Sequence, residues 1–257
     1  MTTILNEGFL ESAVERWRQH FLEKIEELGT NNKNAIKLLT TKNLAMYWAL
    51  GCVTAAELSR QIVSDHIGQT IEQTAGWLYE AILQEAGTQV GITKVEDKQS
   101  PGRQGLDFIQ ITDVERRLID LASTTNTKNG GARRKSINDM IENEQFWNNQ
   151  YNDNPLGGRS NKIVKVWAMA RGKSKNAINN HGILEVRGEA MWTYFGLGEG
   201  FVDKLSAELG KQQISPEELN GPKELSEEAI QQYLSLKKFA DNVSGTIDYG
   251  ALIAYHP

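Results

Sequence analysis

Two aspartates, Asp107 and Asp120, have the residue type and spacing that metal chemistry requires. They lie in short segments rich in β-branched residues, 105–111 and 114–122, which predict neighbouring strands joined by a turn. Two carboxylates on adjacent strands can hold Mg²⁺ through oxygen, with water and phosphate oxygens completing the shell. Such an ion lowers the pKa of an attacking water and neutralises charge on a phosphorane. The pair therefore suits phosphodiester hydrolysis.

The register of this predicted hairpin decides whether the carboxylates meet. With a turn at residues 112–113, Asp107 faces Leu118, and Asp120 becomes its diagonal neighbour on the same face. Side chains two apart on a strand also share a face, so position 122 joins them. A nearby lysine would usually orient or deprotonate the attacking water, but residue 122 is Ala122. The alternative for the two aspartates is an ordinary solvated strand face.

Basic residues gather in two stretches without acid, 121–138 and 154–184, although the whole chain has a net charge of −5. This segregation predicts one positive face suited to a polyanion. Small polar side chains there can donate to phosphate oxygens, while Asn and Arg are types that read base edges. The first stretch supplies the predicted DNA contacts Ser123, Thr124, Thr125, Asn126, Thr127, Lys128, Asn129, Arg133, Arg134 and Lys135. The second supplies Arg171, Lys173, Lys175, Asn176, Asn179, Asn180 and His181.

These loops have a simpler interpretation as flexible surface segments. As a lone histidine, His181 is predicted to contact phosphate or a base, or to cap a turn, rather than to bind metal. Cys52 is the single cysteine, which excludes an intramolecular disulfide and a cysteine-based metal site. No apolar run approaches the roughly 20 residues of a membrane span, and the first residues do not resemble a secretory signal. The sequence therefore predicts a cytoplasmic protein.

The elements that must position these residues follow from periodicity and turn signals. Helices are predicted over 9–29, 33–50, 136–151, 188–196, 199–211 and 224–242. The stretch 54–87 is predicted as one helix or a helix pair, with Gly68 or Gly76 as the position of a break in the second case. Strands are predicted over 89–95, 105–111, 114–122, 162–170 and 183–186. This order favours an α/β fold with a mixed central β-sheet flanked by helices. The length favours one domain, 1–257, with a helical region at 1–87, a core at 88–195 and C-terminal helices at 196–257.

Four stretches resemble the PD-(D/E)xK nucleases, and more closely the PmeII-like type II restriction endonucleases. They are WLYEAIL at 77–83, GRQGLDFI at 102–109, LIDLASTTNTKNGG at 118–131, and the block from KVWAMARGKSKN to FVDKL at 165–205. The resemblance extends over most of the chain. It implies a restriction-endonuclease-like fold and Mg²⁺-dependent cleavage of double-stranded DNA.

The resemblance also assigns roles to individual residues. Asp107 and Asp120 would bind the metal, and Glu80 would be the helix glutamate presented to the active site, although Glu72 or Glu85 could take its place. The catalytic set would be Asp107, Asp120, Glu80 and position 122. A homodimer acting on a short palindromic site is further implied, with a DNA methyltransferase modifying the same site.

The sequence departs from this family at Ala122, where the pattern has lysine. Either the lysine has been substituted, which would leave an impaired enzyme, or another lysine such as Lys128 has taken over its role. Two other functions stay open. The chain could be a repair or structure-specific nuclease, or a non-catalytic DNA-binding protein with a decayed site.

Overall fold

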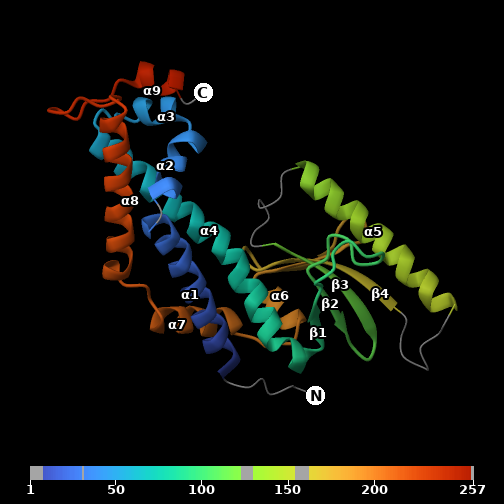
Figure 1. Ribbon diagram of the computed structural model, residues 1–257. Coiled ribbons are helices and arrows are strands. Elements are labelled where there is room, and N and C mark those ends of the chain that lie inside the picture. Colours follow the sequence, from blue (N-terminus) through green and yellow to red (C-terminus); the bar gives the residue numbers. More distant parts are fainter. Residues whose placement is uncertain (1–7, 31, 123–129, 154–161, 256–257) are drawn as a thin grey trace. The chain divides into compact units, whose positions relative to one another are not determined.

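A computed structural model describes residues 8–30, 32–122, 130–153 and 162–255 (Figure 1). The chain divides into two compact units. Unit 1 comprises Met1–Arg16 and Ala75–Gln212, and unit 2 comprises Trp17–Thr74 and Gln213–Pro257. Each unit thus combines stretches that are distant in sequence. The single domain over 1–257 stays a prediction.

Unit 1 is built on a six-stranded sheet in the order β1-β2-β3-β4-β6-β5. The strands are β1 Ile92–Lys94, β2 Phe108–Ile111, β3 Glu115–Ala122, β4 Lys162–Met169, β5 Lys175–Ile178 and β6 Leu184–Arg187. β3, β4 and β6 run parallel, whereas β1–β2, β2–β3 and β5–β6 pair antiparallel. The predicted mixed central sheet is confirmed.

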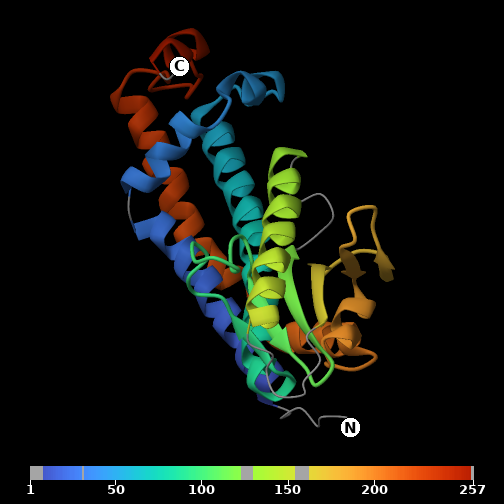
Figure 2. The same ribbon diagram turned by 90° about the vertical axis from the view of Figure 1, so that its right-hand side faces the viewer.

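Helices cover the sheet of unit 1. Helix α5, Gly130–Asp153, lies along one face, as Figures 1 and 2 both show, and its Met140 packs with Leu118 of β3 and Trp167 of β4. Away from that cluster, Trp192 of α6, Glu189–Tyr194, packs against aromatic rings of α4 and α7. Helix α7 spans Phe201–Lys211. Two helices are shared with unit 2: α1, Gly8–Thr30, whose first part belongs to unit 1, and α4, Ala55–Val90, whose last part does. The α/β class with flanking helices is therefore confirmed.

Unit 2 is helical in its described residues. It contains α2 Asn32–Thr41, α3 Leu44–Ala49, α8 Pro216–Leu236 and α9 Tyr249–Tyr255, with the remaining parts of α1 and α4. Its core joins Leu39, Leu58, Ile62 and Ile230, each 0% exposed. Among the helices that the structure describes, none has the length and apolarity needed to cross a membrane.

Several predicted boundaries are wrong. Helix α4 continues through Gly68 and Gly76 to Val90, because a helical glycine costs only about 1 kcal/mol, which tertiary packing can offset. It ends at Gly91, whose φ of 70° suits a helix C-terminus, so β1 starts later than predicted. Strand β5 lies in the predicted loop after β4, where its pairing with β6 decides its conformation.

Other differences concern the helices. The stretch 33–50 holds two helices, and α9 was not predicted. A capping box at Ser215 starts α8 before the predicted position 224. Helix α5 begins at Gly130 rather than at 136.

The predicted register of the β2–β3 hairpin is also wrong. Phe108 pairs with Ile119, so Asp107 does not face Leu118. The turn lies one residue later than predicted, at residues 113–114, since the Thr112 N–H donates to the Glu115 carbonyl at 3.0 Å. The shift is an even number of residues, and an even shift leaves each side chain on its predicted face.

Candidate active site

The carboxylate of Asp107 is fixed between the strands on either side of β2. Its backbone N–H donates to the Ile119 carbonyl at 2.9 Å, and its carbonyl accepts the Val95 N–H at 2.9 Å. Its Oδ2 accepts the Leu121 N–H of β3 at 2.8 Å. Three backbone contacts therefore hold this carboxylate beside the last residues of β3.

Asp120 is a nearly buried carboxylate of β3, with 2% of its surface exposed. It occupies the face of the sheet that α5 covers, where the Ser136 hydroxyl of α5 donates to its Oδ2. A buried carboxylate requires polar partners because removing it from water is costly. The hydrogen bond from α5 meets part of that requirement.

Lys98, from the segment between β1 and β2, brings a positive charge to these carboxylates. Its ammonium is ion-paired with Asp107 Oδ1. Burial lowers the pKa of Lys98, but the hydrogen bond to Asp107 and the charges of Asp107, Glu80 and Asp120 outweigh it, so the pKa is raised. The three acids assigned to the site from the sequence thus all act on one ammonium group.

The same contacts distinguish Glu80 from its two alternatives. Glu80 lies on α4, and its carboxylate is 3.5 Å from Lys94 Nζ of β1. Glu85 is ion-paired with Arg16 of α1, while Glu72 belongs to unit 2. Of these glutamates, Glu80 is the one whose charge acts on Lys98.

Ala122 follows Asp120 on the same face of β3 but has apolar surroundings. It is 6% exposed and belongs to a cluster with Leu118, Trp167 and Met169. A charged ammonium surrounded by such side chains would be costly. Position 122 is therefore a packing position in this fold.

The donor set fits a hard divalent cation. Carboxylate oxygens are the ligands that Mg²⁺ prefers, and it keeps several waters when one or two carboxylates hold it. Asp107 already accommodates a cationic group at Oδ1, and a carboxylate can accept more than one partner. Within the described ranges, no group of three or more His, Cys, Asp or Glu side chains could hold an ion. A metal here would depend on the pair Asp107 and Asp120 with water and phosphate.

Of the predicted DNA contacts in the first basic stretch, some lie outside the described residues and the others lie on α5. Ser123, Thr124, Thr125, Asn126, Thr127, Lys128 and Asn129 lie outside the described residues. On α5, Arg134 is exposed and Lys135 pairs with Asp139 at 2.7 Å, whereas the Arg133 guanidinium lies 4.7 Å from the Trp167 ring centroid. Arg133 therefore reaches the same face of the sheet as Asp120.

The second predicted contact segment is a turn followed by strand β5. Arg171 and Lys173 are exposed in the turn, and Asn176 is exposed on β5. Lys175 is ion-paired with Glu185 of β6 at 2.7 Å. The His181 backbone N–H donates to Asn179 Oδ1, so the polar residues after β5 make a hydrogen-bonded turn.

Four residues of this region were missed by sequence reasoning: Lys98, Ser136, Glu185 and Arg187. No local pattern connects Lys98 or Ser136 to the aspartates. Glu185 did carry a signal, because an acid between apolar residues of a strand, two positions before an arginine, indicates a buried charge with partners.

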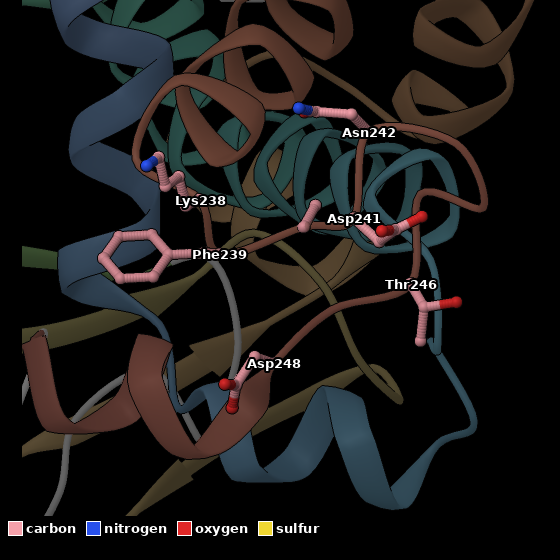
Figure 3. A pocket seen from close by; sticks show the side chains of 7 residues that line it. Lys238, Phe239, Asp241, Asn242, Thr246 and Asp248 are labelled. Atoms are coloured by element: carbon pink, nitrogen blue, oxygen red, sulfur yellow. The ribbon is translucent and has the colours of Figure 1, made fainter.

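A pocket in unit 2 is a weaker candidate for a functional site than the aspartates of unit 1 (Figure 3). Its lining includes Asp241 and Asp248, whose side chains Figure 3 shows well apart. Asp241 accepts the N–H groups of Val243 and Ser244, and Asp248 accepts that of Ala251. Both carboxylates therefore stabilise local turns.

Comparison with protein-family models and with curated protein sequences gives no match for this chain.

Proposed function

We propose that this protein is a Mg²⁺-dependent endonuclease of double-stranded DNA, of the type II restriction class. The observation that carries the proposal is the arrangement around Lys98. Its ammonium pairs with Asp107, and the negative charges of Glu80 and Asp120 also stabilise its protonated form. Acids and one cation that come together from a helix, a connecting segment and a strand suit a reaction in which phosphate charge must be neutralised.

Each residue of the proposed active site has its own role in hydrolysis. Asp107 and Asp120 would hold Mg²⁺, which when bound supplies an acidified water and neutralises phosphate charge. Lys98 donates a hydrogen bond that orients the water toward phosphorus. One P–O bond forms to the water oxygen and the bond to the leaving sugar oxygen breaks. A proton passes from the water to solvent, and the leaving sugar oxygen takes up a proton from solvent. The charge of Glu80 acts on Lys98, and Lys94 pairs with Glu80 at 3.5 Å.

Lys98 supplies the ammonium that position 122 lacks. The apolar cluster around Ala122 favours alanine as a functional residue there rather than a damaged lysine position. Lys98 thereby replaces the two earlier hypotheses, an inactivating substitution and a role for Lys128.

The enzyme would act as a cytoplasmic homodimer on a short palindromic site, next to a methyltransferase that modifies that site. A symmetric dimer matches a symmetric duplex. Unit 2 supports self-association, because an exposed apolar surface typically marks an interaction site. Most of its large exposed apolar side chains lie on α3, the turns that follow it and the C-terminal region: Met46, Trp48, Leu50, Val53, Leu236, Val243 and Tyr255. Two others, Ile71 and Leu225, lie on α4 and α8.

Mg²⁺-dependent cleavage of a mixed-sequence plasmid tests the proposal with four proteins. They are the present chain, Lys98→Ala, Ala122→Lys, and the control Lys211→Ala, which removes an ion-paired lysine of α7. The present chain and the control should give discrete fragments. Lys98→Ala should cut about 100-fold more slowly, as expected for loss of a group that orients the attacking water.

The other outcomes separate the two claims. If only Ala122→Lys cuts, the nuclease proposal stands and Lys98 is not the lysine of the site. If no protein cuts although all bind duplex, the active-site assignment is wrong and a DNA-binding protein with a decayed site takes its place.

A further inference from the structure

The face of the sheet that carries Asp120 also carries a group of cations. In one row across the sheet, Asp120 pairs with Trp167, and Trp167 pairs with Glu185. Two residues further along the strands, in the next row on the same face, Ala122 pairs with Met169, Met169 with Arg187, and Arg187 with Lys175. Residues directly opposite one another share a face, so the charged residues of β5 and β6 lie on the same face as Asp120.

Glu185 organises these cations. Its Oε2 accepts hydrogen bonds from Lys175 Nζ and Arg187 Nη2, both at 2.7 Å. Its Oε1 lies 3.2 Å from Asn179 Nδ2 and 3.8 Å from Arg133 Nη2. Three cations surround one carboxylate, so the group formed by Arg133, Lys175, Arg187 and Glu185, here called the Glu185 cluster, has a surplus of positive charge.

The cations of the cluster are accessible while its carboxylate is not. The side chains of Arg133, Lys175 and Arg187 are 50%, 40% and 25% exposed, and that of Glu185 is 3% exposed. An incoming anion would therefore meet the cations without direct contact with the acid.

Two donors on this face also lack an acceptor. Arg187 Nε and Trp167 Nε1 are buried and have no hydrogen-bond partner among the residues that the structure describes. Buried N–H groups normally find an acceptor, so an orphaned donor requires an explanation. The Arg187 side chain is still 25% exposed, so the rest of its guanidinium is accessible to an anion with several acceptor oxygens.

We infer that the Glu185 cluster binds phosphate groups of the nucleic-acid strand that enters the active site. The inference rests on the proposed function in taking DNA as the anion. Arg187 and Lys175 contact phosphate oxygens, Arg133 adds charge from α5, and Glu185 is a positioning residue that fixes the cations. Trp167 of β4 lies between this cluster and Asp120, so the cluster is one strand away from the candidate active site.

The test is binding of a fluorescein-labelled duplex of mixed sequence, measured by anisotropy in EDTA over a range of salt concentrations. EDTA removes Mg²⁺, so binding is measured without cleavage. Lys175→Ala and Arg187→Gln should weaken binding, by about 3-fold to 10-fold each, and each should lower the slope of log K against log salt by about 1. Thermal unfolding checks that each variant is folded.

The control is Lys211→Ala, because Lys211 pairs with Glu208 at 2.8 Å much as Lys175 pairs with Glu185. It should leave both affinity and salt slope unchanged. If the unmodified chain binds duplex and both cluster variants match it in affinity and slope, the phosphate-binding role is wrong and the nuclease proposal is unaffected. If the unmodified chain does not bind duplex at all, both proposals fail.

Discussion

Asp120 and Glu185 are two buried carboxylates in one row of one sheet, yet their surroundings differ. Asp120 is 2% exposed and Glu185 is 3% exposed, and Trp167 lies between them. Glu185 has two cations in hydrogen-bond contact and a third nearby, whereas Asp120 receives a hydroxyl hydrogen bond from Ser136.

This difference separates two uses of a buried acid. A carboxylate surrounded by cations has its charge compensated within the fold, and its role is to position those cations. A carboxylate held by a hydroxyl, near a second carboxylate and one shared ammonium, is better suited to a cation from solution. The comparison therefore supports the proposals that Asp107 and Asp120 bind the metal and that the Glu185 cluster binds phosphate.

The largest expected effect separates the two acids by activity. Asp120→Asn should reduce Mg²⁺-dependent plasmid cleavage by about 1000-fold, because metal charge stabilisation contributes several kcal/mol. Glu185→Gln should stay within about 10-fold of the unmodified chain at saturating DNA, since it changes binding rather than chemistry. Initial rates of supercoiled plasmid loss measure both. Equal losses in the two variants would break the comparison.

A second prediction concerns stability and pH. Burial raises the pKa of Glu185, but hydrogen bonds from Lys175, Asn179 and Arg187 and the charge of Lys175 outweigh it and lower the pKa from 4.5 to about 2. A folded pKa below the unfolded value gives a stabilisation that is full above about pH 4.5 and is lost as the pH falls toward 2. Glu185→Gln should therefore cost about 1–3 kcal/mol near neutral pH and much less at acid pH.

Urea unfolding at about pH 6 and about pH 3 measures this difference for the unmodified chain and the variant. Glu208→Gln is the matched control, because Glu208 is held by Lys211 and Gln212 rather than by three cations. A difference between chain and variant that does not shrink at low pH would show that the Glu185 charge is not what stabilises this part of the fold.

The smallest effect tests Asp120 through its hydroxyl donor. Ser136→Ala leaves the buried carboxylate without that hydrogen bond and should cost about 1 kcal/mol of unfolding free energy. Ser136→Thr keeps a hydroxyl and should lose less. Added Mg²⁺ should recover part of the loss in Ser136→Ala and none of the loss in Glu185→Gln. Recovery in both variants, or in neither, would contradict the assignment of the metal to Asp120.

Sequence and tertiary structure each determined a different part of this description. Alternating apolar residues were enough to place Asp120 on a strand and to predict a mixed sheet with flanking helices, but β2 begins at Phe108 and not at the predicted 105, so Asp107 lies just before its strand. Local periodicity reports such features because side-chain alternation is a property of the strand itself. The predicted register was wrong, but an even shift leaves faces unchanged, so the placement of Asp120 did not depend on the turn.

Only the tertiary structure decided which side chains contact Asp107, Asp120 and Glu185. Lys98 reaches Asp107 because the segment between β1 and β2 returns to the sheet, and Glu185 meets Lys175 because β5 pairs with β6. Arg133 and Ser136 reach the same face because α5 packs across β3 and β4. These contacts depend on helix packing and strand order, and neither produces a periodic pattern of residues from which the contacts could be predicted. Asp107 and Asp120 could therefore be singled out from the sequence, while Glu185 and the cations around these acids required the fold.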